Sequence, residues 1–312
     1  MEPMGKHPSS RPLNYGSDRR VWPGGLVRQK LDNNIGTRPF RRRRTDGPRL
    51  FRSGSLQRAY DRHGFVVVPL LDDVEVGIVR REFDKLDHPD LTGFFSSLYS
   101  SDHDYKVATS TVLEPFARKA AARYLTGARL LATNFVTKSG PTSSMGPHQD
   151  WTFVDERGWS SLNVWCPLMD VSHRTGALYL LDGGQRLPFT IRGANIPSAF
   201  AEIEEEVRAA MTCVPMRQGD ALMYDHRLLH ASPVNESDEI RVAAVAVFFP
   251  EATRPLHFRA SEGARLERYE IDDTFFVTYT FGSDDLPVST TYQGAVSWEN
   301  PRLTMQQVQR LG

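Results

Sequence analysis

Gly146-Pro-His-Gln-Asp-Trp151 places a histidine and an aspartate two positions apart, with one residue between them. If this stretch is a β-strand, alternation sends the side chains of His148 and Asp150 to the same face. An imidazole and a carboxylate side by side are two ligands for a metal ion. The pattern alone is weak evidence for a metal site, because it also occurs in His88-Pro-Asp90. There the proline argues against a central strand and favours a turn.

A second stretch, Tyr224-Asp-His-Arg-Leu-Leu-His-Ala-Ser232, offers a third ligand. A distant imidazole that joins His148 and Asp150 completes the 2-His-1-carboxylate arrangement of non-haem iron sites, which leaves the opposite coordination positions open. His226 and His230 have the same parity along a strand, so alternation does not separate them.

Arg241 opens Val242-Ala-Ala-Val-Ala-Val-Phe-Phe249, a continuous apolar run that predicts a buried strand. Arginine is seldom fully buried without a partner, so we expect an anion beside it. A carboxylate bound in bidentate fashion next to the metal would satisfy the guanidinium.

This set of residues resembles the phytanoyl-CoA dioxygenase-like branch of the Fe(II)/2-oxoglutarate oxygenases, over roughly Arg58 to Pro250. Members carry HxD, a distal histidine with a serine two residues later, and an arginine a short way beyond. The offsets favour His230 as the ligand and leave His226 as a supporting or surface residue. The matching residues of this chain are His148, Asp150, His230, Ser232 and Arg241.

The resemblance implies an all-β core with added helices, in a double-stranded β-helix (jelly-roll, cupin-like) fold with N-terminal helices packed on one sheet. It implies Fe(II) held by His148, Asp150 and His230, with 2-oxoglutarate and O2 as cosubstrates. Arg241 and Ser232 would grip the far carboxylate of 2-oxoglutarate.

The implied activity is that of a dioxygenase that hydroxylates an unactivated C–H bond and releases succinate and CO2. Asp150 favours hydroxylation over halogenation, because halogenating relatives have a small residue at this position. Desaturation, epoxidation and cyclisation stay open, since they use the same iron chemistry. A jelly-roll binding protein without catalysis is a more remote alternative, because we would expect it to have lost part of the five-residue set. A cupin-like hydrolase or isomerase would leave Ser232 and Arg241 without a role.

The substrate is expected to be a small metabolite, free or linked to CoA or a carrier. Arginine strongly outnumbers lysine, a bias more common in GC-rich bacterial genomes, which favours bacterial specialised metabolism. Trp151 and Phe153 are candidates for the substrate mouth or for the core. Tyr224 and Arg192 are further candidate substrate contacts.

Three more residues are candidate contacts to 2-oxoglutarate. Asn134 lies on an expected strand over residues 129–138, where the family places such a contact. Trp165 matches a tryptophan that packs beside 2-oxoglutarate in family members, and the alternative is a core aromatic. Gln149 occupies a position that the family often uses near the ligands, although a regular strand would point it away from the metal.

The 312 residues carry no net charge, but the charge is unevenly spread. Residues 1–58 hold 14 Lys or Arg and 4 acids, a net of +10, so the rest carries −10. We expect residues 1–57 to form a basic, poorly structured arm. Its Arg41-Arg-Arg-Arg44 run is either solvated or an anion-binding element.

We expect the oxygenase domain over residues 58–282 and a C-terminal extension over 283–312. Within the domain, residues 185–211 are predicted to be a lid or an oligomer surface. A helix is expected over 114–124 with Pro115 in its first turn, a strand over 275–281, and a closing helix over 305–311.

Two cysteines, Cys166 and Cys213, lack CxxC spacing, which favours a reducing compartment and argues against a zinc site or disulfide framework. No signal-like or membrane-length apolar run occurs, so a cytoplasmic protein without a membrane partner is expected. The acidic main part disfavours nucleic acid as a partner. The sequence is compatible with a monomer or a homodimer.

Overall fold

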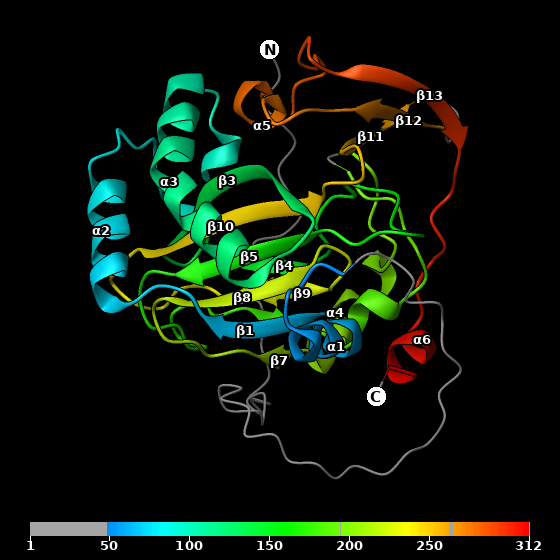
Figure 1. Cartoon of the computed structure of the whole chain (residues 1–312). Helices are drawn as coiled ribbons and strands as arrows, with labels where there is room; N and C mark the ends of the chain where they lie inside the picture. The colour runs from blue at the N-terminus through cyan, green and yellow to red at the C-terminus, as the bar shows by residue number, and fades with distance from the viewer. Residues whose placement is uncertain (1–48, 194, 262–264, 312) are drawn as a thin grey trace.

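The computed structural model describes residues 49–193, 195–261 and 265–311 of the chain. Within them, most of the core is β-structure in antiparallel sheets, with few helices, as the sequence predicts (Figure 1). The main sheet has six strands, in the spatial order β1 (Phe65–Pro69), β8 (Asp220–Asp225), β5 (Leu162–Pro167), β10 (Arg241–Pro250), β3 (Ala128–Ser139) and β2 (Gly93–Ser96).

Two smaller sheets accompany the main sheet. One has the order β4 (Met145–His148), β9 (His230–Ser232), β6 (Tyr179–Leu180) and β7 (Thr212–Cys213). The other has the order β11 (Leu256–Ser261), β12 (Arg265–Glu270) and β13 (Thr291–Ser297), and lies near α5 at the top of Figure 1.

Strand β10 lies between β5 and β3 and is buried along its whole length. Its alternate residues enter different hydrophobic clusters. Val242 and Ala244 pack in the cluster that includes the helices, whereas Ala243 and Val245 pack in the cluster shared with the four-stranded sheet. Burial on both faces explains why this strand is a continuous apolar run rather than an alternating one.

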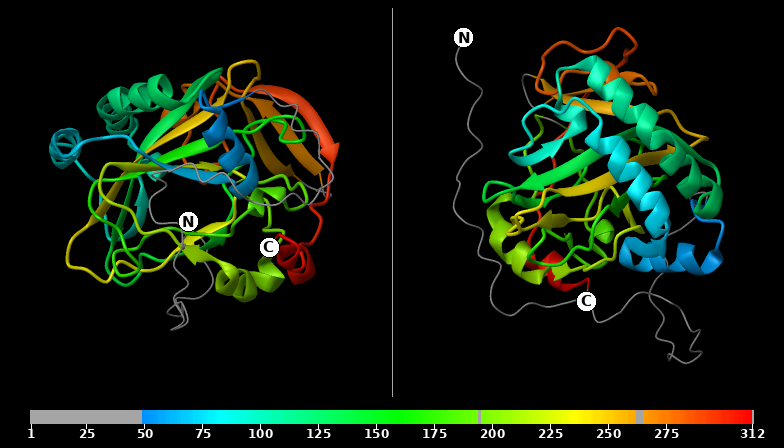
Figure 2. Two further views of the ribbon diagram at one scale, coloured as in Figure 1. Left: turned by 60° about the horizontal axis from the view of Figure 1, so that its bottom comes forward. Right: turned by 90° about the vertical axis from the view of Figure 1, so that its left-hand side faces the viewer.

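Three helices cover one face of the main sheet: α1 (Gly54–His63), α2 (Asp73–Asp84) and α3 (His103–Tyr124). Figure 2, right, shows α2 and α3 side by side across the strands. The remaining helical segments are short, and they are η1 (Ser97–Tyr99), η2 (Gly184–Arg186), η3 (Ala201–Ile203), α4 (Glu204–Ala210), α5 (Phe275–Thr278) and α6 (Met305–Gln309).

The prediction that a helix starts at Glu114 was wrong, because α3 begins eleven residues earlier, after its N-cap Asp102. Pro115 therefore lies in the middle of the helix rather than in its first turn. It removes the hydrogen bond to the carbonyl of Thr111, and both residues are exposed, so water can satisfy that carbonyl. The buried face of α3, which includes Leu113 and Phe116, supplies the packing that outweighs the lost bond.

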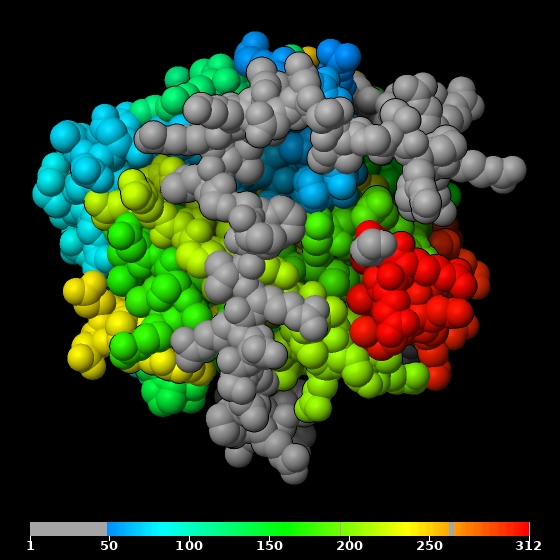
Figure 3. Space-filling view, turned by 90° about the horizontal axis from the view of Figure 1, so that it is seen from below, coloured from blue at the N-terminus to red at the C-terminus, as the bar shows by residue number. Residues whose placement is uncertain are grey.

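The domain limits stay a prediction, and the structure shows how the chain packs near both of them. The Arg41–Arg44 run lies outside the described residues, but Leu50 and Phe51 are already buried in the core, before the expected boundary at residue 58. At the other end, the segment predicted as a C-terminal extension, residues 283–312, contributes β13, which pairs with β12. The predicted closing helix is present as α6, and Figure 3 shows the C-terminal residues in red against the yellow-green segment that contains α4.

The strand expected over residues 275–281 was wrong, because this segment starts with the one-turn helix α5. A strand would send Phe275 and Phe276 to opposite faces. In the turn of α5, both are buried and their rings contact each other edge to face, with centroids 5.1 Å apart. Aromatic packing has replaced strand pairing here.

Residues 185–211 pack closely against the body of the protein. Phe200 and Val207 are core residues of the cluster that also includes the four-stranded sheet. The role of this segment as a lid or an oligomer surface stays a prediction. No helix in the described part of the chain has both the length and the apolar character to cross a bilayer.

Candidate active site

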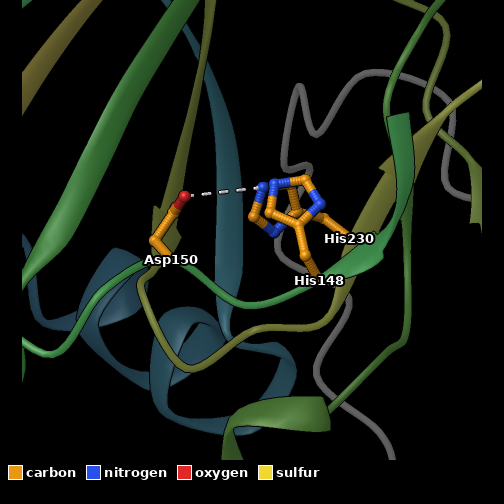
Figure 4. Close-up of side chains that lie close together, drawn as sticks. All are labelled: His148, Asp150 and His230. Carbon is orange, nitrogen blue, oxygen red and sulfur yellow. Dashed lines mark ion pairs between the residues drawn. The ribbon is translucent and has the colours of Figure 1, made fainter. Parts of the chain in front are cut away.

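Three side chains, His148, Asp150 and His230, converge at the edge of the four-stranded sheet (Figure 4). One potential ligand atom from each lies within 4.8 Å of the other two. Pairing of β4 with β9 makes His148 and His230 direct partners across the strands, and their ring centroids are 4.1 Å apart. The Oδ1 atom of Asp150 is 3.8 Å from Nε2 of His230, which is the dashed line in Figure 4.

Both histidines are held with the same ring nitrogen turned toward the protein. Nδ1 of His148 donates to the carbonyl of Gly146 at 2.9 Å, and Nδ1 of His230 donates to the carbonyl of Leu228 at 3.0 Å. A carbonyl can only accept, so the proton is on Nδ1 and the lone pair is on Nε2. This is the tautomer that a metal ion requires when it binds at Nε2.

Asp150 reaches the cluster from a loop rather than from a strand. Strand β4 ends at His148, so the alternation expected for the His-Gln-Asp stretch does not apply to Asp150. Its backbone N–H donates to the carbonyl of His226 at 3.1 Å, and its Oδ2 accepts from Nδ2 of Asn163 at 2.8 Å. These two bonds orient the carboxylate so that Oδ1 is the atom that faces the histidines.

The protonation states at neutral pH suit a metal ion. Burial lowers the pKa of His148 to about 4, so its imidazole is neutral and can act as a ligand. Burial would raise the pKa of Asp150, but the electrostatic effect of His230 and its neighbours lowers it, so this carboxyl is ionised. His148 and Asp150 are therefore present in the deprotonated forms that bind a metal ion.

A cavity of about 230 Å³ opens beside the cluster. All three ligand residues line it, and so does Arg241 at the start of β10. Arg241 is fully buried, and its guanidinium carbon lies 5.2 Å from the ring centroid of Trp165, in a cation–π arrangement.

Arg241 has no carboxylate partner among the described residues. Its Nε has no hydrogen bond, and Nη1 makes one long contact of 3.5 Å with the carbonyl of Gly176. Burial lowers its pKa to about 9, so the guanidinium is still charged at neutral pH. An isolated buried cation is costly, and here an anion that enters the cavity would relieve the cost.

Lys138 is a second buried basic side chain nearby, which the sequence reasoning did not single out as a site residue. Its Nζ donates to the carbonyls of Ser232 and Pro233, at 3.1 and 2.5 Å. Burial first, and then the charge of Arg241, lowers its pKa well below the usual value. Lys138 thereby fixes the backbone that carries Ser232 into the cavity.

Most other predicted residues also line the cavity. Asn134 donates to Ser96 at 3.0 Å, and the hydroxyl of Tyr224 accepts from Asn163 at 3.1 Å. Gln149 is held by the carbonyl of Arg227 and by Thr190, so its amide braces the loop that precedes Asp150. The predicted residues found in the cavity wall are Asn134, Gln149, Trp151, Phe153, Trp165, Tyr224 and Ser232.

Arg192 was predicted as a substrate contact, but it does not line this cavity. Its two Nη atoms bind the carboxylate of Glu156 at 2.6 Å each, and its Nε donates to the carbonyl of Asp150 at 2.7 Å. Glu156 is buried, so the pair is shielded from solvent. Arg192 therefore supports the Asp150 loop and is not available to a substrate.

His226 is a supporting residue rather than a surface residue. It is fully buried, its Nδ1 lies 2.7 Å from Oγ of Ser161, and its carbonyl holds the backbone of Asp150. Asn163 was missed by the sequence reasoning. It lies two residues before Trp165 on β5, so strand alternation, which puts both side chains on one face, was a signal that could have found it.

The family model described as phytanoyl-CoA dioxygenase (PhyH) matches residues 60–243. The chain belongs to the phytanoyl-CoA dioxygenase family. This match covers the main part of the cavity wall, including His148, Asp150, His230 and Arg241. The predicted cofactors, iron and 2-oxoglutarate, agree with the family and with the three-residue cluster.

Solved structures that match this chain include the non-haem α-ketoglutarate-dependent epimerase SnoN from nogalamycin biosynthesis. It has 23% identity and a TM-score of 0.48, over 80% of this chain and 94% of that chain. The carbocyclase SnoK from the same biosynthesis has 17% identity and a TM-score of 0.47, over 66% of this chain and 86% of that chain.

HygX from Streptomyces hygroscopicus, solved with nickel and 2-oxoglutarate bound, has 17% identity and a TM-score of 0.47, over 64% of this chain and 87% of that chain. At this degree of similarity nothing about the substrate of the present chain follows from these three structures. A search of curated proteins finds no match to the chain.

Proposed function

We propose that this chain is an Fe(II)- and 2-oxoglutarate-dependent oxygenase that hydroxylates a C–H bond of a small molecule. Its core is proposed to be a double-stranded β-helix, in which the six-stranded and four-stranded sheets pack against each other through one hydrophobic cluster. The proposed metal ligands are His148, Asp150 and His230.

The observation that carries the proposal is the unpaired guanidinium of Arg241 in the same cavity as the three ligands. A metal site alone would suit many reactions. A buried cation next to that site, without a carboxylate partner among the described residues, calls for an anionic ligand, and a dicarboxylic keto acid supplies one. The donor set of two imidazoles and one carboxylate leaves open positions and suits Fe(II).

The residues of the chain have separate tasks in this mechanism. His148, Asp150 and His230 would hold the iron, and Asn163 keeps Asp150 turned toward it. Iron together with 2-oxoglutarate supplies the oxidation of a C–H bond by O2, with succinate and CO2 as coproducts.

Arg241 would bind the distal carboxylate of 2-oxoglutarate, and Trp165 keeps its guanidinium plane in place. Ser232, whose backbone is held by Lys138, would offer its hydroxyl to the same carboxylate. The apolar residues around this end of the cavity, among them Leu178 and Val245, exclude water.

Hydroxylation is the preferred outcome because a carboxylate, Asp150, takes the third ligand position. Desaturation, epoxidation and cyclisation use the same residues and differ in what the substrate does after the C–H bond is oxidised. The arginine-rich composition, with 32 arginines and 6 lysines, favours a role in bacterial specialised metabolism.

The test is anaerobic addition of Fe(II) and 2-oxoglutarate to the full chain. We expect the weak visible charge-transfer band of an iron-chelated keto acid, and we expect it to be lost in His230→Ala. Exposure to O2 should then yield succinate. A protein that binds iron but gives neither the band nor succinate would overturn the proposal.

A further inference from the structure

The lining of the cavity beside the metal ligands has two chemically different parts. The cosubstrate part is basic and contains Arg241 with Ser232. The other part consists of aromatic rings, which we call the ring wall. The ring wall consists of Phe94, Tyr99, Trp151, Phe276 and Phe281.

The ring wall begins directly beside the metal site, since Trp151 follows Asp150 in the chain. Trp151 and Phe281 are stacked, with centroids 5.2 Å apart and ring planes 19° apart. Tyr99 lies against the same Phe281 ring at 4.4 Å. Three rings from three distant segments thus form one continuous aromatic surface.

The ring wall is also uncharged. Among the residues that the structure describes, the cavity is lined by no Lys, Arg, Asp or Glu except Asp150 and Arg241. Both of these belong to the metal and cosubstrate region. An anionic or cationic group that entered against the ring wall would lose its water and gain no partner of opposite charge.

The chain holds part of the ring wall in place from outside the cavity. Lys106 of α3 is buried, and its Nζ donates to the carbonyl of Tyr279 at 2.6 Å. Tyr279 lies between the wall residues Phe276 and Phe281 in the sequence. Its ring stacks on that of Phe275, with centroids 5.0 Å apart. Phe276 and Phe281 lie beyond residues 60–243, which match the family, whereas Phe94, Tyr99 and Trp151 lie within them.

We propose that the substrate of this site presents a flat, uncharged, unsaturated ring system to the ring wall, and that Trp151, Tyr99 and Phe281 select for it. The inference rests on the proposed function, because it takes the ring wall as the substrate end of an oxygenase cavity. Aromatic contacts favour flat rings by about 0.5–1.5 kcal/mol per pair beyond the area that they bury. A group joined to CoA or to a carrier fits only if its charged part stays outside the cavity.

Three probes with related skeletons separate shape from charge. 2-Naphthol is flat and neutral, trans-2-decalol is neutral but saturated, and 2-naphthalenesulfonate is flat but anionic. Their dissociation constants are measured by calorimetry on the full chain with Fe(II) and 2-oxoglutarate, without O2. We expect 2-naphthol to bind roughly tenfold or more tightly than either of the others. Equal affinities, or tighter binding of decalol or of the sulfonate, would overturn the proposal.

Two variants connect the binding to the ring wall. Phe281→Leu keeps an apolar side chain but removes the ring, and it should weaken 2-naphthol binding roughly three- to tenfold, the range that such a contact energy implies. Lys106→Met should weaken it as well by releasing the Tyr279 carbonyl, whereas Lys85→Met, at an exposed lysine paired with Glu82, should not. Unchanged 2-naphthol affinity in Phe281→Leu would overturn the proposal even if Lys106→Met does not fold.

The two proposals fail in different ways. The charge-transfer band and the affinity for 2-oxoglutarate report on the metal and on Arg241, and both should be unchanged in Phe281→Leu. Loss of the band with intact preference for 2-naphthol would remove the oxygenase function and leave an aromatic-binding site. An intact band without that preference would remove only the inference about the substrate.

Discussion

His148 and His230 are direct register partners of β4 and β9, so strand pairing itself brings the two imidazoles together. The position of the third member, Asp150, depends on hydrogen bonds outside the strand pairing. Asp150 follows the end of β4 and is oriented by two hydrogen bonds to its backbone and one to its carboxylate. The carboxylate arm of the site should therefore be the part most sensitive to substitution of supporting residues.

Asn163→Ala should weaken Fe(II) binding roughly tenfold or more, because residues that orient a ligand contribute about 10–100-fold to metal affinity. Nδ2 of Asn163 holds Oδ2 of Asp150, and without it the carboxylate is free to turn. Isothermal titration with Fe(II) under argon measures the effect. In an Asp150→Gly background the same substitution should add little, and an equal effect in both backgrounds would show that Asn163 does not act through Asp150.

Arg241→Met should raise the dissociation constant for 2-oxoglutarate by roughly a hundredfold or more. Removing one partner of a buried pair costs about 3–5 kcal/mol, which is about two to four decades of affinity. Arg241→Lys should recover only part of the loss, because an ammonium cannot reproduce the planar fork.

The same Arg241→Met variant separates two roles for the guanidinium. Because Arg241 has no carboxylate partner among the described residues, the ligand-free variant should melt no lower than the parent protein. Arg254→Met, at an exposed arginine, is the matched control for a change of charge. A large fall in melting temperature together with unchanged 2-oxoglutarate affinity would assign Arg241 to the fold instead of to the cosubstrate.

The metal-free protein should lose stability as the pH falls from about 6.5 to about 4. His257 is buried among aromatic rings, and burial, with a contribution from Arg259, lowers its pKa to about 4. The unfolded chain then binds a proton in this range that the folded chain does not. This difference in proton binding changes the free energy of unfolding by at most about 1.4 kcal/mol per pH unit.

His257→Phe should flatten that slope, measured by urea unfolding at several pH values. His103→Gln, at an exposed position on α3, should leave it unchanged. Identical slopes in all three proteins would mean that His257 does not contribute.

Gly219→Ala should be strongly destabilising, because Gly219 has φ +79° and a Cβ there would lie 2.3 Å from the carbonyl oxygen of Leu71. Gly140→Ala isolates the conformational cost, since Gly140 has φ +68° with no atom within 4 Å of the added Cβ. That cost is about 1–2 kcal/mol, whereas Gly158→Ala, in open space without positive φ, should be nearly neutral. Urea titrations should give the lowest free energy of unfolding for Gly219→Ala, a higher value for Gly140→Ala and the highest for Gly158→Ala. A Gly219→Ala protein as stable as Gly140→Ala would contradict the close contact.

The metal cluster was predictable because its residue types suit a metal ion and its spacing resembles that of a known family. His148 and Asp150 are donors of the type that a metal needs, and the cost of burying a charge pointed to Arg241, but only the resemblance to the family favoured His230 over His226. The strand β10 was predictable for a related reason, since a run of apolar residues from 242 to 249 is compatible with burial on both faces.

What could not be predicted depends on contacts between distant segments. The length of α3 reflects packing of residues such as Leu113 on a sheet that the local sequence does not reveal, so Pro115 was misplaced. Phe276 and Phe281 were predicted to lie in a strand, because their partners Trp151 and Tyr99 are more than a hundred residues away in the sequence. Arg192 looked available to a substrate only because Glu156 could not be recognised as its buried partner.

The unpaired charge of Arg241 also bears on how long the protein survives. A ligand that binds only the folded state stabilises that state in proportion to the logarithm of its concentration. Because the guanidinium lies at the first residue of the central strand β10, an anion bound there would resist the opening of the core. Degradation of the enzyme should then slow when central metabolism supplies abundant keto acid and quicken when it does not, so that the amount of catalyst follows the supply of its cosubstrate.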